Sequence, residues 1–261
     1  MRKFVLAVAV LVLATPAVNA AFDETEHINR TIRMDPGGTL RLKSFSGRVT
    51  ITASDRPEVV VDAVRRARRS RLDRIKLDIH TAGSNVVVVD ANRRERSWYG
   101  FFGGDNVVET DFDIKVPRRT NLDLSVFSAP VSVEGVEGSH RVHSFSSRLS
   151  LNDVAGSIRA HTFSGPVLIR AKSWGPNQTI DVDTFSGNVE LHVPESAHGS
   201  VSFNSFSGRL NSEMPLILHS SSRRSLEAEL GSLKAERGGD DAGNNGTLRF
   251  KTFSGSVRID R

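Results

Sequence analysis

A short motif built around phenylalanine recurs along the chain and limits the folds open to it. Each copy places Ser, Thr or Val before the Phe, and Ser and then a small residue after it. We call the seven phenylalanines the Phe column: Phe45, Phe127, Phe145, Phe163, Phe185, Phe206 and Phe253. From Phe127 onward the spacings are 18, 18, 22, 21 and 47 residues, and 82 residues separate Phe45 from Phe127. A period of about 20 residues is typical of a solenoid or a stacked array of strands.

Apolar and polar residues alternate on both sides of each motif. Around Phe163, Ile158 and Ala160 precede the motif, and Val167 and Ile169 follow it. This alternation predicts half-buried strands, and the Ser-Gly pair between them predicts a turn. We therefore expect an all-β chain, a β-solenoid or β-helix-like stack of short strands with rungs of ~18–22 residues. A short helical turn is expected over 67–75.

The phase of the alternation predicts where the phenylalanines point. Around Phe163, alternate residues over 158–164 share one face, including the Ser or Thr before the Phe and the Ser after it. The apolar residues of 167–169 have the opposite parity, so one residue is inserted at the corner, as in a bulge. The Phe column would then lie outside, and the buried hydroxyls would hydrogen-bond from rung to rung. Two alternatives stay open: the corner turns Phe into the core, or loops at 92–106 and 215–246 cover it.

Several short segments give the repeat units a family resemblance. The dipeptide Val116-Pro117 leads into Asn121-Leu122-Asp123-Leu124, and Val136-Glu137-Gly138-Ser139 and Val154-Ala155-Gly156-Ser157 begin new units. Together with the strand–Ser-Gly–strand pattern, these segments resemble the bacterial putative-adhesin family, an exported β-strand-repeat domain of unknown function. The resemblance covers about residues 40–261. It implies a β-helix-like solenoid in an exported or envelope-facing protein, without assigned catalytic residues. This chain departs from the usual pattern by placing Phe before nearly every Ser-Gly.

The first twenty residues are typical of a secretory signal peptide. Arg2 and Lys3 precede an apolar stretch that Pro16 interrupts, and Ala20 ends a small-x-small cleavage pattern. The apolar stretch is too short to span a bilayer. We therefore expect an exported protein, periplasmic, surface-located or secreted, with no transmembrane anchor after cleavage.

The predicted organisation is one solenoid with an irregular first part. The expected segments are a signal peptide at 1–20, an irregular N-terminal β part at 21–106 with an aromatic and glycine-rich loop at 92–106, regular rungs at 107–261, a polar insertion at 215–246 and a closing rung at 247–261.

The loop at 92–106 offers a second candidate binding surface. It carries four aromatic residues among glycines: Trp98, Tyr99, Phe101 and Phe102. Such a loop can hold a sugar ring or a partner protein, or enter a membrane interface. The alternative is that it folds over one end of the solenoid and covers the core.

A run of basic residues forms a candidate polyanion patch. Its members are Arg65, Arg66, Arg68, Arg69, Arg71, Arg74 and Lys76. Such a patch could bind an anionic envelope polymer or phospholipid headgroups. Alternatively, it is a solvated cap that prevents strands from adding to one end of the solenoid.

Two histidines and an aspartate occupy the same position in successive repeats and form a weak candidate zinc site. They are His143, His161 and Asp183. The residue types suit zinc, but exposed positions would leave them without groups to orient them. We therefore expect no metal and no cofactor.

The sequence lacks enzyme signatures and favours a binding role. It contains no G-x-S-x-G, H-E-x-x-H, P-loop or G-x-G-x-x-G motif. With no cysteine in the chain, cysteine nucleophiles and thiolate zinc sites are excluded. We predict a non-catalytic exported module that binds an envelope component, a polymer or a protein, and no nucleic acid. The alternatives are a regulatory or stress-associated envelope protein acting through a membrane signalling partner, and a polysaccharide-active β-helix enzyme.

Overall fold

The computed structural model describes residues 24–94, 107–231 and 246–261. The expected signal peptide at 1–20, the four loop aromatics Trp98, Tyr99, Phe101 and Phe102, and residues 232–245 of the expected insertion lie outside the described residues.

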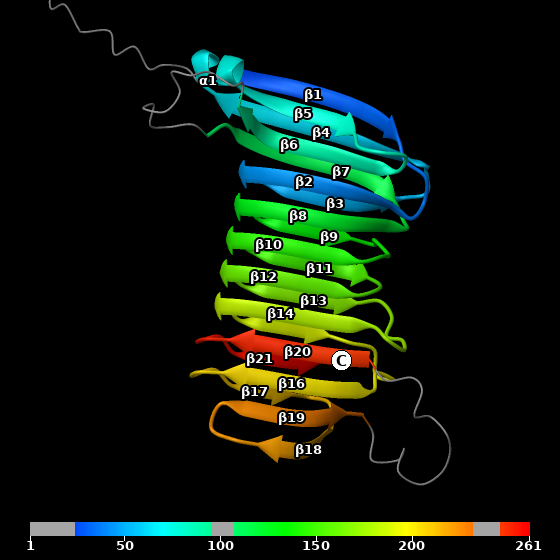
Figure 1. The fold of residues 1–261 in the computed structure, drawn as a ribbon, viewed down its shortest axis with the longest axis vertical. Coiled ribbons are helices and arrows are strands. Elements are labelled where there is room, and N and C mark those ends of the chain that lie inside the picture. The colour runs from blue at the N-terminus through cyan, green and yellow to red at the C-terminus, as the bar shows by residue number, and fades with distance from the viewer. Residues whose placement is uncertain (1–23, 95–106, 232–245) are drawn as a thin grey trace, which may run out of the picture.

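The chain is all-β, as predicted, and its strands form two long mixed sheets (Figure 1). Sheet A contains, in spatial order, β1 (Glu24–Arg33), β4 (Glu58–Ala67), β7 (Glu109–Pro117), β3 (Val49–Ser54), β9 (Val131–Glu134), β11 (Leu149–Val154), β13 (Val167–Ala171), β15 (Val189–His192), β21 (Val257–Asp260) and β17 (Leu210–Ser212). Sheet B contains β18 (Leu216–Ser221), β19 (Ser225–Leu230), β16 (Gly199–Ser205), β20 (Gly246–Thr252), β14 (Thr179–Ser186), β12 (Ile158–Ser164), β10 (His140–Ser146), β8 (Thr120–Ser128), β2 (Gly38–Ser46), β6 (Val86–Arg94) and β5 (Ile75–Thr81). A short helix, α1 (Arg69–Arg74), lies within the predicted helical turn.

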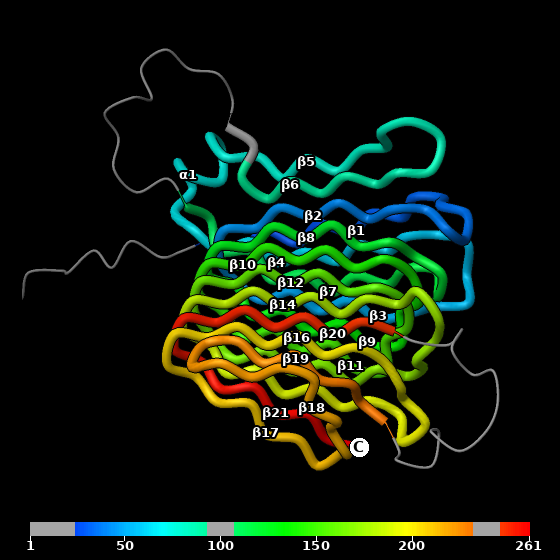
Figure 2. Tube along the Cα trace, turned by 60° about the horizontal axis from the view of Figure 1, so that its bottom comes forward, coloured from blue at the N-terminus to red at the C-terminus, as the bar shows by residue number. Residues whose placement is uncertain are grey.

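Each repeat unit supplies one strand to sheet B and the next strand to sheet A. Successive units pair in parallel and in register, so that Val142 of β10 lies opposite Ala160 of β12, which lies opposite Val182 of β14. In sheet A, Leu149 of β11 lies opposite Val167 of β13 in the same way. Figure 2 shows these units following one another as similar turns of the chain.

The core lies between the two sheets, where the alternating apolar residues meet. Leu40 and Leu42 of β2 are fully buried, as are Val49 and Ile51 of β3. The same pattern repeats in the other units, because in-register pairing places like residues above one another. Burial of these columns holds the two sheets together.

Strand direction changes at both ends of the stack. Sheet A ends in the antiparallel strands β7, β4 and β1, and sheet B ends in the antiparallel pair β6 and β5. At the other end, β16, β19 and β18 of sheet B are antiparallel. The long gap between Phe45 and Phe127 is therefore occupied by strands without the motif, from β4 to β7. The described part of the expected polar insertion, residues 215–231, contains β18 and β19.

The unit expected to close the stack lies inside it. β20 pairs with β14 on one side and with β16 on the other, and β21 lies between β15 and β17. The prediction that residues 247–261 form the closing rung is wrong. The copies of the motif are nearly alike, so the sequence alone does not indicate their order in the stack.

Candidate functional site

The Phe column lies on the outside of sheet B as a continuous stack of rings. In space the order is Phe45, Phe127, Phe145, Phe163, Phe185, Phe253 and Phe206, with ring centroids 4.5–5.0 Å apart and planes within 14° of parallel. Each ring is 38–53% exposed. The outward position predicted from the alternation is therefore correct, and the corner does not turn Phe into the core.

A Ser or Thr precedes the Phe in every copy of the motif except at Phe127, which follows Val126, and in several copies its hydroxyl holds the corner. These residues are buried, and the Oγ1 of Thr252 accepts a hydrogen bond of 2.7 Å from the backbone N–H of Gly255. Ser205 binds Gly208 in the same way at 2.6 Å. These bonds lie within one corner, and the Oγ1 atoms of Thr162 and Thr184 have no partner among the described residues. The predicted bonding of these buried hydroxyls from rung to rung is wrong, although the Oγ of the exposed Ser207 donates to the carbonyl oxygen of Phe253 in the neighbouring unit at 3.4 Å.

The Ser after each Phe is also placed differently from the prediction. Ser128, Ser146, Ser186, Ser207 and Ser254 are exposed rather than buried, and Ser46 and Ser164 are half-buried. The corner therefore begins at the Phe, and the serines flank the Phe column on its far side. This adds a polar margin to the apolar strip.

Glycine at the corner allows neighbouring units to approach closely. Gly165 has φ +122°, and a Cβ on it would lie 2.2 Å from the carbonyl oxygen of Ser147 in the neighbouring unit. A Cβ on Gly187 would lie 2.2 Å from the carbonyl oxygen of Gly165. Both distances are shorter than any van der Waals contact, so glycine keeps the corners, and with them the rings, in register.

A shallow groove of ≈ 840 Å³ runs beside the Phe column. Five rings form one wall, those of Phe127, Phe145, Phe163, Phe185 and Phe253. The outward residues two positions earlier form the other: Ser125, His143, His161, Asp183 and Lys251. An apolar wall facing a polar wall suits a ligand that is itself apolar on one side.

The two histidines of the groove stack on each other. The rings of His143 and His161 are 5.2 Å apart and within 9° of parallel, and His161 Nδ1 lies 3.9 Å from Asp183 Oδ2. Partial burial, and then the nearby His161, lower the pKa of His143. Because the three residues lie on three successive strands, they form a line rather than a tetrahedral set. The geometry adds no support to the weak zinc candidate.

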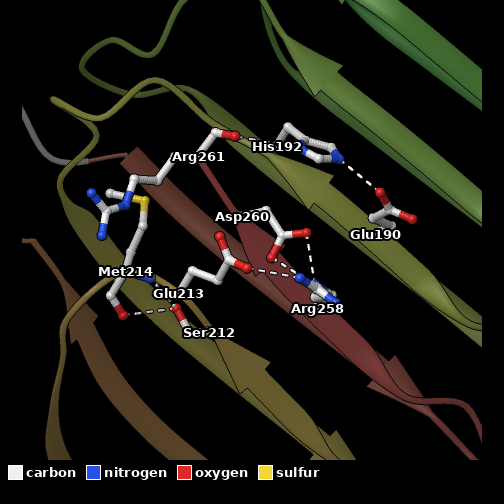
Figure 3. A network of polar contacts seen from close by, with 8 residues as sticks. All are labelled: Glu190, His192, Ser212, Glu213, Met214, Arg258, Asp260 and Arg261. Carbon is white, nitrogen blue, oxygen red and sulfur yellow. Dashed lines mark hydrogen bonds and ion pairs between the residues drawn. The ribbon is translucent and has the colours of Figure 1, made fainter.

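A different group brings three potential ligand atoms within 4.8 Å of one another: Glu190, His192 and Asp260 (Figure 3). Sequence reasoning missed this group, although Glu190 and His192 share a face of one strand. Arg258 Nε lies 2.8 Å from both oxygens of Asp260, and Arg258 also contacts Glu213 at 2.7 Å. Because Arg258 already neutralises Asp260, the group is better described as an ion-pair network than as a metal site.

The candidate polyanion patch is partly neutralised. Arg65 is buried, where it pairs with Glu26 and donates to the carbonyl oxygen of Ile75. Arg65 is therefore not a surface residue, which corrects its place in the patch. Arg66 pairs with Asp111 at 2.6 Å, and Arg69 pairs with Glu24 at 2.9 Å. These ion pairs weaken the positive field expected from the run.

A second basic feature, also missed from the sequence, lies at the end of the Phe column. Phe206 lines a hollow of ≈ 470 Å³ together with Arg209, Arg223 and Arg224. The guanidinium carbon of Arg224 lies 4.4 Å from the centre of the Phe206 ring, which is a cation–π contact. In the part of the chain that the structure describes, no carboxylate forms an ion pair with these three arginines. In the sequence, only the adjacent Arg223 and Arg224 indicate this hollow, and they lie within the segment expected to be a polar insertion.

No protein-family profile matches the chain, and no curated protein matches it. A solved structure of a putative cell adhesion protein from Clostridium sporogenes matches with a TM-score of 0.51 at 12% identity, covering 90% of this chain and 99% of that one. A putative adhesin from Bacteroides fragilis matches with a TM-score of 0.32 at 8% identity, covering 90% and 97%. The match to the C. sporogenes protein confirms the resemblance at the level of the fold, and at 12% identity it extends no further. Among the described residues, no helix is both long and apolar enough to cross a membrane.

Proposed function

We propose that this chain is an exported, non-catalytic binding module whose Phe column engages an envelope component, a polymer or a protein. One observation carries the proposal: seven aligned, half-exposed phenylalanines on one face. Contiguous exposed apolar surface is uncommon on monomeric proteins and usually marks an interaction site. The fold of the C. sporogenes protein is consistent with this role.

The proposed architecture is a β-solenoid, in which the regular rungs of 107–261 continue the irregular part at 21–106. The parallel, in-register pairing of successive units supports it. Such a stack presents the same side chains at each step, so its surface is suited to a long or repetitive ligand. Export rests on the signal-peptide pattern of residues 1–20.

A sedimentation experiment tests the proposal. The purified protein is pelleted with cell envelopes and, separately, with isolated envelope polysaccharide. A triple variant, Phe145→Ser, Phe163→Ser and Phe185→Ser, is compared with Leu218→Ser, which removes an exposed apolar side chain (59% exposed) outside the column. Circular dichroism first establishes that both variants fold.

The expected result is that the parent and Leu218→Ser pellet with envelopes, and that the folded triple variant stays in solution. If the triple variant pellets as well as the parent does, the Phe column is not the binding surface. If the parent does not pellet with either preparation, the envelope role itself is wrong.

A further inference from the structure

Resting on the proposed function, we propose that the ligand of the Phe column is a single-chain anionic amphiphile, such as a long-chain fatty acid. Its acyl chain would lie along the ring edges in the groove. Its headgroup would reach the arginine hollow beside Phe206. Three observations favour this ligand: the orientation of the rings, the width of the strip, and the positive charge at one end, which has no acidic partner among the described residues.

The stacking of the rings selects against sugars. Sugar rings bind aromatic side chains through the flat faces of the aromatic rings, whose π systems are negative. In the Phe column each inner ring has both faces covered by its neighbours at 4.5–5.0 Å. At one end, Arg224 covers Phe206. Apart from the outer face of Phe45 at the other end, what remains exposed is a ribbon of ring edges, which offers dispersion contact to an aliphatic chain but no face to a sugar.

The dimensions of the strip favour a single acyl chain over a membrane surface as the ligand. The strip is one ring wide, with His143, His161 and Asp183 along one side and exposed serines along the other. A flat bilayer surface would have to desolvate these flanking groups, which is unfavourable. Six ring steps make the strip about 29 Å long, about twice the depth of one bilayer leaflet of roughly 15 Å. A single extended acyl chain therefore fits along it.

The exposed area also argues against a second copy of the chain as the occupant. With 38–53% of each ring exposed and about 200 Å² for a whole phenylalanine, the seven rings offer about 600 Å². A stable interface buries about 800 Å² from each partner. The flanking polar residues do not supply the missing apolar area.

The arginine hollow supplies the complement to an anionic headgroup. Phe253 lines the groove, and Phe206 lines the arginine hollow. The two rings are stacked 4.8 Å apart, so the groove and the hollow are adjacent. Arg209, Arg223 and Arg224 have no acidic partner in the described residues. A carboxylate or phosphate can accept two parallel hydrogen bonds from a guanidinium.

The test is calorimetric titration of the full chain with octanoate, dodecanoate and hexadecanoate, each below its micelle concentration. A methylene covered on one side gains about half of the full burial energy, so the affinity should rise about twofold for each methylene.

The triple Phe→Ser variant should lose this dependence on chain length. The double variant Arg223→Gln and Arg224→Gln should bind dodecanoate about tenfold more weakly and dodecanol as the parent does. Arg30→Gln, an exposed charge on β1 at the other end of the stack, is the matched control.

Each other outcome identifies a different failure. If dodecanoate binds no better than octanoate, or if the folded triple variant binds it equally well, the amphiphile proposal is wrong. If the parent still sediments with envelopes and the triple variant does not, the proposed function stands although the amphiphile proposal is wrong. If sedimentation velocity shows a dimer that the triple variant does not form, a second copy is the occupant. If neither envelopes nor amphiphiles bind, both proposals fail.

Discussion

At the scale of single residues, His140 is the exception in a buried aliphatic column. It lies opposite Leu122 on one side and Ile158 on the other, with its side chain in the core. Burial lowers the pKa of His140 from 6.5 to about 4, because the charged imidazolium is poorly solvated in the core. The histidine is therefore neutral in the folded protein at neutral pH.

This burial predicts a pH-dependent stability. Between pH 6.5 and about 4 the unfolded chain binds a proton at His140 that the folded chain does not, so the free energy of unfolding falls as the pH is lowered through this window. The loss should approach roughly 3 kcal/mol at the lower limit. Urea unfolding at a series of pH values measures it. The variant His140→Leu, which completes the aliphatic column, should lose most of this dependence; an unchanged pH profile would show that other groups cause it.

The histidine pair in the groove gives a second prediction at this scale. Partial burial and the neighbouring His161 lower the pKa of His143, so replacing His161 with Ala should raise it. Titration of the His143 ring signals by NMR measures the change. Replacing His192, which lies in sheet A away from the groove, should leave the pKa of His143 unchanged. Equal effects of the two substitutions would rule out the direct contact as the cause.

At the scale of elements, the corner between the two sheets determines whether neighbouring units can pack. Gly165→Ala places a Cβ 2.2 Å from the Ser147 carbonyl oxygen at a positive φ. The expected loss of stability is at least about 2 kcal/mol. Gly175→Ala is the control, because nothing lies within 4 Å of its added Cβ, and its change should stay within about 0.5 kcal/mol. Thermal unfolding compares the two, and similar melting temperatures would contradict the close-packed corner.

The strands and their orientation could be predicted from the sequence, but the position of the bend and the arginine hollow could not. The alternation around Phe163 predicted both strands of the unit and the outward Phe, because periodicity reports directly on which face is buried. The serines after each Phe were misplaced, because the bend begins one residue earlier than parity alone indicates. The strands β18 and β19 lie in a segment whose composition suggested an insertion. The arginine hollow is lined by Arg209 together with Arg223 and Arg224, which lie in another segment of the chain, so no local pattern contains it.

At the scale of the whole molecule, the repeated units should be separable. Removing residues 147–164 joins Ser146 directly to Gly165 and restores the corner motif, with β11 and β12 absent. In a stack whose units contact only their neighbours, the shortened chain should fold with a lower melting temperature and one ring fewer. Circular dichroism and thermal unfolding check this. Removing only 147–155, half a unit, should prevent folding because it breaks the strand pairing. If the two deletions behave alike, the stack is not modular.

The internal position of β20 and β21 has a consequence for how the chain is made. A ribosome or a translocation channel delivers the polypeptide from its N-terminus, so the strands on either side of the gap emerge before the pair that fills it. Until residues 246–260 arrive, β14 and β16 present unpaired edges toward each other, and such edges recruit strands from other chains. We therefore expect nascent chains of this protein to be prone to aggregation until the gap is filled.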